Sequence, residues 1–141
     1  RMAGEQDPPT AAAAYTEALR SALPATEDGV PVLDLALLGL GPDGHIASLF
    51  PDTAALTATE PAVANWVPKL ETWRLTLTYP VLNAARGVWL LAAGSGKAEV
   101  VEQIQSASAA DSFPVLPVQN LAPQGGYLWL FDTAAAPRLK Q

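Results

Sequence analysis

Residues that could carry out catalysis are concentrated in one short run of the chain. His45, the single histidine of the sequence, lies two residues after Asp43 and among Gly39, Gly41 and Gly44. A neutral imidazole accepts a proton from water near pH 7, because its ordinary pKa is about 6.5. Backbone amides that glycines expose at the start of a helix can stabilise an oxyanion. The run therefore predicts a site that hydrolyses an ester or a lactone, with Asp43 orienting the imidazole or capping the following helix.

Two cations lie where a bound anion would account for them. Lys97 follows a predicted strand and falls in the first turn of a helix predicted over 95–106. The helix dipole favours an anion there and slightly disfavours a lysine, so a phosphate contact would explain Lys97. Arg74 opens another strand as a second candidate anion contact. Structural alternatives stay open: solvated surface charges for Lys97 and Arg74, an ordinary helix residue for His45 and a turn former for Asp43.

Two nucleotide-binding motifs are present only in part. The run 39–44 satisfies the pattern G-x-G-x-x-G, but Pro42 removes one of the amides that would contact a phosphate. The run 94–97 is similar to the end of a P-loop. Leu91, however, stands in place of its first glycine, and Ala98 replaces its Mg²⁺-binding hydroxyl residue. The sequence therefore argues against a dinucleotide site and a P-loop.

Strands and helices alternate along the chain, which predicts an α/β fold. The run from Val32 to Leu40 is apolar except for Asp34, as expected for a strand buried on both faces, and it leads through the glycine turn into a short helix. Periodicity, proline and glycine place the other elements: helices at 9–23, 80–86 and 95–106, strands at 74–78, 87–93 and 127–131, and irregular segments at 52–61 and 114–117. We therefore predict one α/β unit with a mostly parallel sheet covered on both sides.

Composition limits the classes of function. The chain has 141 residues, half of them apolar, and a net charge of −6. An acidic protein is a poor partner for nucleic acid or anionic membranes, although a few local cations suffice to bind a small anion. The absence of cysteine excludes disulfides and thiolate metal sites. No apolar run approaches the roughly 20 residues of a membrane helix, and we see no secretory signal, so we expect a cytoplasmic protein.

Several ordered blocks of the sequence resemble the family of 6-phosphogluconolactonases. The run 37–51, LLGLGPDGHIASLFP, resembles the signature of that family. Three later blocks follow in the family's order: RLTLT with PVLNAAR within 74–86, GSGKA at 94–98, and WLFD with three alanines within 129–136. The blocks cover most of the chain, and the whole of 1–141 resembles the C-terminal portion of a single lactonase domain.

The resemblance implies a fold, a reaction and roles for particular residues. The implied fold is three-layered and Rossmann-like, a mostly parallel sheet with helices on both faces, as in glucosamine-6-phosphate deaminase. The implied reaction is hydrolysis of 6-phospho-D-glucono-1,5-lactone to 6-phosphogluconate, a step of the pentose phosphate pathway, without metal or organic cofactor. His45 is the implied general base for water, and Lys97 is implied to bind the 6-phosphate. The remaining candidate site residues are the acid Asp43 and, for the substrate, Gly41, Gly44 and Arg74.

Two other functions stay open. The deaminase shares G-x-x-D-G-H-I-A but carries a carboxylate five residues after the histidine, where this chain has Phe50, so the lactonase is favoured.

The chain departs from the family in its sequence and in its length. The family usually has glycine where this chain has Asp52, which is a minor departure. Members of the family are longer, and their N-terminal part supplies the first strands, a phosphate loop and an Asp-Glu-Arg element. We therefore expect a missing N-terminal segment of the same enzyme to cover exposed sheet and helix surfaces. A non-catalytic sugar-phosphate-binding module is the alternative.

Overall fold

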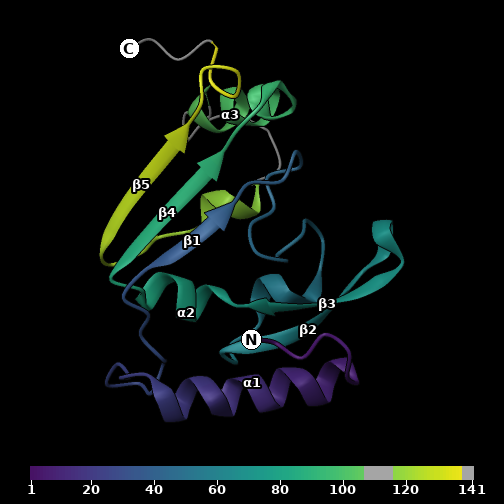
Figure 1. Cartoon of the computed structure of the whole chain (residues 1–141), viewed down its shortest axis with the longest axis vertical. Helices are drawn as coiled ribbons and strands as arrows, with labels where there is room; N and C mark the ends of the chain where they lie inside the picture. The colour runs from purple at the N-terminus through teal and green to yellow at the C-terminus, as the bar shows by residue number, and fades with distance from the viewer. Residues whose placement is uncertain (107–115, 138–141) are drawn as a thin grey trace.

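The computed structural model describes residues 1–106 and 116–137, which form an α/β structure (Figure 1). The helices are α1 (Pro8–Ala22), α2 (Tyr79–Ala84) and α3 (Ala98–Ser106). The strands are β1 (Ala36–Gly39), β2 (Ala62–Val67), β3 (Thr72–Leu77), β4 (Gly87–Ala92) and β5 (Gly126–Phe131). Four 3₁₀ turns connect them: η1 (Ala54–Thr57), η2 (Pro68–Leu70), η3 (Ser95–Lys97) and η4 (Pro117–Asn120). The part of the predicted irregular segment around Pro114 lies outside the described residues.

Three strands form a parallel sheet, with β4 between β1 and β5 (Figure 1). This sheet confirms the predicted α/β class. β1 is shorter than the strand predicted from Val32 to Leu40, and the prediction that it is buried on both faces is wrong. Leu38 is 7% exposed, whereas its neighbour Leu37 is 61% exposed. A continuous apolar run does not distinguish a strand covered on both sides from one that is covered on one side only.

One face of the parallel sheet forms the core of the molecule. Leu38, Val88 and Leu90 point to this face and pack with buried residues of α2, α3 and η4. Leu82 of α2 and Val101 of α3 are almost completely buried there. Because burying such a side chain contributes roughly 1.5–3 kcal/mol, this cluster fixes the strands that carry the candidate site.

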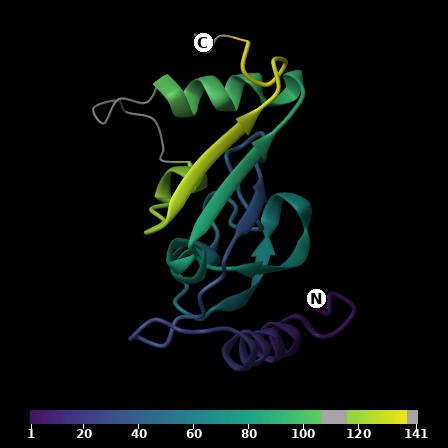
Figure 2. The ribbon, with the colours of Figure 1, turned by 60° about the vertical axis from the view of Figure 1, so that its left-hand side comes forward.

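The opposite face of the sheet is apolar and exposed. No described helix crosses it, as the front of Figure 1 and the turned view of Figure 2 show. The helices that the sequence predicts on both faces are therefore found on one face in this part of the chain. The side chains of the open face, each at least 40% exposed, are Leu35, Leu37, Trp89, Leu91, Leu128 and Leu130. An apolar patch of this kind marks an interaction surface. We call this set of residues the open sheet face.

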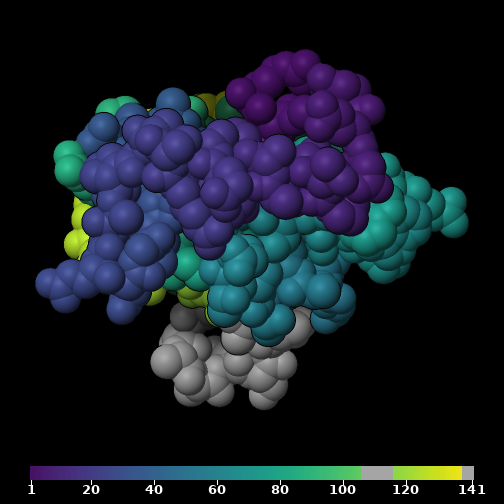
Figure 3. Space-filling model, turned by 90° about the horizontal axis from the view of Figure 1, so that it is seen from below, coloured from purple at the N-terminus to yellow at the C-terminus, as the bar shows by residue number. Residues whose placement is uncertain are grey.

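β2 and β3 form a separate antiparallel hairpin, on which α1 packs (Figure 3). The sequence predicts β3 from its alternating pattern, and that strand is confirmed. β2 is not predicted from the sequence. The hydroxyl of Thr16 on α1 joins the two elements, because it accepts a hydrogen bond from the Ala62 amide at 3.2 Å and donates to the Ala62 carbonyl at 3.3 Å.

The first helix lies within one residue of its predicted bounds. Asp7 caps α1, since its carboxylate accepts hydrogen bonds from the amide and the hydroxyl of Thr10 at 3.1 and 2.7 Å. Pro8 and Pro9 lie in the first turn, where a missing amide breaks no helical hydrogen bond. Sequence and structure agree here because the cap is local.

Candidate functional site

His45 and Asp43 form a close pair just beyond the carboxyl end of β1. The Nδ1 atom of His45 lies 2.5 Å from Oδ1 of Asp43, and the two side chains are 24% and 25% exposed. An ionised carboxylate only accepts hydrogen bonds, so Nδ1 carries a proton and donates a hydrogen bond to Oδ1 of Asp43. The Nε2 atom then has the free lone pair and can act as a base. Asp43 thus contacts the imidazole, and the backbone amide of His45 also donates to the same Oδ1 at 3.4 Å, so the structure contains a contact for each of the two predicted roles.

The helix predicted to start at the glycine turn is absent. Residues after Gly41 form turns and short bridges, in which Ile46 pairs with Leu40 and Leu49. The Gly41 amide donates to the His45 carbonyl at 2.8 Å, and the Gly44 amide donates to the Gly41 carbonyl at 3.0 Å. These two amides are thus used within the turn, and the prediction of an oxyanion site at a helix start is wrong. Hydrogen bonds of a turn therefore take the place of the predicted helix in this segment.

The glycines of the turn are required for close packing rather than for exposed amides. A Cβ atom at Gly41 would lie 2.0 Å from Nδ1 of His45, so the imidazole rests directly on this glycine. Gly44 has a φ of +74° and would bring a Cβ within 2.7 Å of Leu116. The His45 imidazole therefore packs directly on Gly41, whereas Gly44 packs against the core next to η4.

A cleft of about 310 Å³ contains His45 and one of the two predicted cations. Lys97 lines it from η3, the turn immediately before α3, so the predicted position beyond β4 is confirmed. The cleft, which we call the His45 cleft, is lined by Leu37, Leu38, Gly39, Leu40, Gly41, Pro42, His45, Ala47 and Lys97. Because β1 and β4 are parallel neighbours, the loops at their carboxyl ends meet here, as in other α/β sheets.

The surroundings of His45 favour the neutral form of its ring. Partial burial lowers the pKa of His45 below its ordinary value, and repulsion from Lys97 and Arg74 lowers it further. Arg74 acts from β3, where it lies opposite Asn65 and is exposed without lining the His45 cleft. The site thus unites Gly41, Asp43, His45 and Lys97 directly, and adds Arg74 through its field alone.

Two side chains of this site are not predicted from the sequence as contributors to it. The ring of Phe50 stacks on the His45 imidazole with centroids 4.0 Å apart and an angle of 26° between the planes. Lys69, on η2 at the tip of the β2–β3 hairpin, forms an ion pair with Oδ2 of Asp43. Lys69 could not be predicted as a contributor because β2 is not predicted from the sequence. Without the β2–β3 hairpin, nothing in the sequence places Lys69 near Asp43.

Residues beyond the histidine are fixed by an amide from the hairpin. Asn65 is buried, and its Nδ2 donates to the Ser48 carbonyl at 2.9 Å and to the Thr53 hydroxyl at 3.0 Å. The Ser48 amide in turn donates to the Thr76 hydroxyl at 3.1 Å. Asp52 lies in this segment with a φ of +59°, which explains physically why glycine suits that position. The segment that carries Phe50 is therefore held by both strands of the hairpin.

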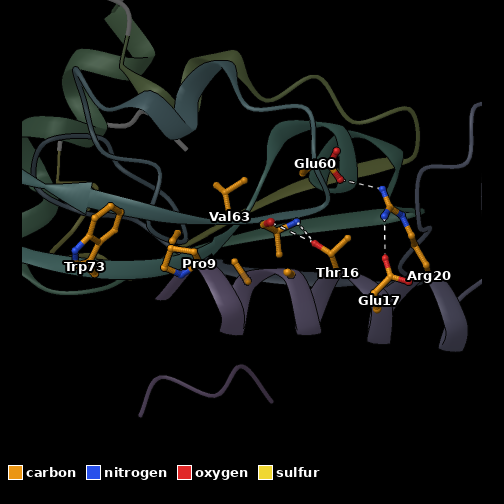
Figure 4. Close-up of a pocket in the computed structure, with 11 residues that line it drawn as sticks. Pro9, Thr16, Glu17, Arg20, Glu60, Val63 and Trp73 are labelled. Carbon is orange, nitrogen blue, oxygen red and sulfur yellow. Dashed lines mark hydrogen bonds and ion pairs between the residues drawn. The ribbon is translucent and has the colours of Figure 1, made fainter. Parts of the chain in front are cut away.

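A second, larger cleft lies away from His45, between α1 and the hairpin (Figure 4). It has a volume of about 490 Å³ and is lined mainly by apolar residues, with Trp73 at one end. Its cation, Arg20, is held by ion pairs with Glu17 at 3.0 Å and Glu60 at 2.9 Å. Arg20 is therefore compensated, in contrast to Lys97, for which residues 1–106 and 116–137 supply no ion-pair partner.

The described residues contain neither a metal-binding cluster nor a membrane-spanning helix. Within 1–106 and 116–137, no group of three or more histidine, cysteine or acidic side chains is placed to hold a metal ion. Among the helices of the same residues, none is long and apolar enough to cross a membrane.

The fold and the Asp–His pair define an α/β protein with a candidate hydrolytic site at the carboxyl edge of a parallel sheet. Residues 1–129 match the family described as glucosamine-6-phosphate isomerases/6-phosphogluconolactonase. This match covers most of the chain, and the chain therefore belongs to the glucosamine-6-phosphate isomerase/6-phosphogluconolactonase family.

Individual relatives within the family carry the name of the lactonase. The chain is 42% identical over 136 residues to 6-phosphogluconolactonase of Streptomyces coelicolor, covering 94% of this chain and 51% of the relative. It is 46% identical over 129 residues to that of Homo sapiens, covering 89% and 48%. The crystal structure of 6-phosphogluconolactonase from Leishmania guyanensis matches with a TM-score of 0.78 and 34% identity, covering 94% of this chain and 53% of the other. The chain thus spans about half the length of these relatives.

Proposed function

We propose that this chain carries the general base of a 6-phosphogluconolactonase, which hydrolyses 6-phospho-D-glucono-1,5-lactone to 6-phosphogluconate. The observation that carries the proposal is the contact between Nδ1 of His45 and Asp43, which leaves Nε2 as the basic atom in a cleft shared with Lys97. The relatives named as lactonases support the choice of reaction. By that reaction, the protein belongs to the pentose phosphate pathway.

The reaction follows from the ionisation of His45. Nε2 takes a proton from water as the water oxygen attacks the lactone carbonyl carbon, which gives a tetrahedral oxyanion. The intermediate collapses with cleavage of the bond between the carbonyl carbon and the ring oxygen. The imidazolium then returns the proton to that oxygen, so the products are the carboxylate of 6-phosphogluconate, one released proton and neutral His45. Asp43 stabilises the imidazolium that forms transiently, because its carboxylate accepts the Nδ1 hydrogen bond throughout.

Two cations, Lys97 and Arg74, are the candidates for attracting the substrate phosphate to the His45 cleft. Lys97 lines the His45 cleft, and Arg74 contributes positive potential from β3. A lysine binds phosphate as a point charge, and positive potential near a cleft concentrates an anionic substrate there. We therefore assign Lys97 to the 6-phosphate and Arg74 to long-range attraction of the anionic substrate. Gly41 forms the floor of the cleft beneath the imidazole, and Gly44 remains a predicted substrate contact.

The open sheet face supports a proposal about partners. In this chain it exposes Leu37, Trp89 and Leu128 side by side on neighbouring strands. Relatives are about twice as long, so a polypeptide that corresponds to the rest of a relative is the partner that we expect on this face. We propose that such an N-terminal segment covers this face, and that 1–141 is the C-terminal portion of one domain. A cytoplasmic location, without nucleic acid or membrane partners, stays a prediction.

The test compares lactone hydrolysis by the wild-type chain and by His45→Ala. Both are assayed alone and mixed with the N-terminal half of the Streptomyces coelicolor relative, and the rates are corrected for the uncatalysed reaction in buffer. Loss of a general base should lower the rate by roughly 10² to 10⁴, with the fold retained. If the wild type and His45→Ala hydrolyse the lactone at the same rate above the uncatalysed reaction, His45 is not part of the mechanism. Ammonia release from glucosamine 6-phosphate would instead favour the deaminase, and binding of a phosphosugar without turnover would favour a binding module.

A further inference from the structure

Lys69 is a cation that touches the candidate site from a different sheet. It lies on η2, between β2 and β3, whereas Asp43 and His45 follow β1. Its ammonium group forms an ion pair with Oδ2 of Asp43, while Oδ1 of the same carboxylate binds Nδ1 of His45. Asp43 is therefore shared between two partners, one on each oxygen.

Phe50 closes this arrangement into a ring of four side chains. The Lys69 nitrogen lies 4.8 Å from the centroid of the Phe50 ring, and the Phe50 ring also stacks on the His45 ring with centroids 4.0 Å apart. A cation over an aromatic ring gains electrostatic stabilisation, and the lysine stem packs on apolar surface. Each side chain of the Asp43 cluster (Asp43, His45, Phe50 and Lys69) thus contacts two others, which limits the positions that the carboxylate can take.

The arrangement resolves a conflict in the charge of His45. A carboxylate beside an imidazole favours the imidazolium, which cannot accept a proton from water. Burial, Lys97 and Arg74 lower the pKa of His45 instead. The ammonium of Lys69 neutralises much of the Asp43 charge, so the carboxylate can orient the ring without charging it. The charged groups that bear on this balance are Asp43, Lys69, Arg74 and Lys97, and Asp52 lines a neighbouring cleft together with Asp43 and Lys69.

We propose that Lys69 is a positioning residue, which holds Asp43 so that the carboxylate orients Nδ1 of His45 while Nε2 stays available as a base. The inference rests on the proposed role of His45 as the base. It assigns to the tip of the β2–β3 hairpin a part in the chemistry at the end of β1. Lys69 acts through Asp43 and does not contact the reacting atoms.

The single histidine makes the first test direct, because every imidazole NMR signal of the chain belongs to His45. In ¹⁵N-labelled wild-type protein above the titration midpoint, the nitrogen shifts and couplings identify the tautomer. The Asp43 cluster predicts a proton on Nδ1. A proton on Nε2 would overturn the inference, because the carboxylate would then not hold the ring. This measurement needs no variant and no activity.

The second test removes the charge of Lys69 and keeps its length. Lys69→Met retains an unbranched apolar stem against Phe50, and we expect the His45 titration midpoint to rise by roughly one pH unit. Lys69→Arg keeps a cation and should titrate like the wild type. Arg86→Met is the matched control, because it removes one positive charge from the exposed ion pair with Asp34 at the far end of β4. A wild-type midpoint in Lys69→Met, or an arginine variant that titrates like the methionine variant, would show that Lys69 does not act through its charge.

Measurements of activity distinguish a failure of the role proposed for Lys69 from a failure of the proposed lactonase function. In an active preparation, Lys69→Met should move the acid limb of the kcat profile upward by the same amount as the NMR midpoint, with KM unchanged. A raised midpoint in a chain that never hydrolyses the lactone would refute the lactonase and leave the charge balance intact. An active enzyme whose acid limb is the same in Lys69→Met and Lys69→Arg would refute the role of Lys69 and leave the lactonase intact. If Lys69→Met does not fold, the wild-type tautomer and the Lys69→Arg midpoint decide.

Discussion

A single methyl group added at Gly41 tests whether the position of the His45 ring controls the reaction. An ideal Cβ there would lie 2.0 Å from Nδ1 and 2.1 Å from Cε1 of His45. Non-bonded heavy atoms pack at about 3.5 Å, so the ring must move by roughly 1.5 Å. This shift breaks the 2.5 Å contact with Asp43. Because misplacing a catalytic group by about 1 Å costs on the order of 10²-fold in rate, we expect Gly41→Ala to lower kcat by about 100-fold, or about 2.7 kcal/mol.

The assay follows 6-phosphogluconate formation above the uncatalysed rate, together with the imidazole NMR signals of His45. We also expect Gly41→Ala to lower the free energy of unfolding by roughly 1–3 kcal/mol, because an extra methyl group strains a packed site. Gly96→Ala is the control: a Cβ at Gly96 meets nothing within 4 Å, so activity should stay at the wild-type level. A Gly41→Ala variant with wild-type kcat and an unchanged tautomer would refute the view that the ring must rest on this glycine.

Three other predictions concern the phosphate, the backbone and the open sheet face. Lys97→Ala should raise KM for the phosphorylated lactone about tenfold or more, since a charged hydrogen bond contributes roughly 1.5–3 kcal/mol. The same variant should leave KM for unphosphorylated glucono-1,5-lactone unchanged. An equal rise for both substrates would contradict the phosphate contact. Asp52→Gly should raise the free energy of unfolding, measured in urea, by about 0.5 kcal/mol, because the backbone strain relieved at a φ of +59° exceeds the entropy that glycine adds to the unfolded chain. Asp28→Gly is the control: Asp28 has an ordinary φ, so this substitution should lower the free energy of unfolding. Leu37→Lys should reduce self-association of the isolated chain in sedimentation experiments and weaken capture of an N-terminal half; unchanged behaviour in both would show that the open sheet face is not the contact.

The sequence predicts the parts of the site that depend on neighbouring strands. β1 and β4 are separated by a crossover and lie parallel, so the segments after them must meet at one edge of the sheet. This topology alone brings His45 and Lys97 to the same cleft. The boundaries of α1 are likewise predictable, because the Asp7 cap and the following prolines are local signals.

Other parts of the site depend on contacts that periodicity cannot show. The helix expected after Gly44 is replaced by turns, because the Val118 amide binds the Gly44 carbonyl at 3.0 Å and Leu116 packs against that glycine. The partner of Asp43 comes from the hairpin, whose first strand has no clear alternating pattern. The exposure of Leu37 depends on what covers the sheet, which the apolar run itself does not encode.

The most direct test of the central claim compares two pH titrations of the same active protein. One is the NMR titration of His45, and the other is the pH dependence of kcat/KM for 6-phospho-D-glucono-1,5-lactone. Burial, Lys97 and Arg74 lower the pKa of His45, so the neutral base persists to a lower pH than in an ordinary histidine. We predict that kcat/KM falls tenfold per pH unit below the NMR midpoint, and that the two midpoints coincide. A rate that stays constant while His45 becomes protonated would show that this histidine is not the base.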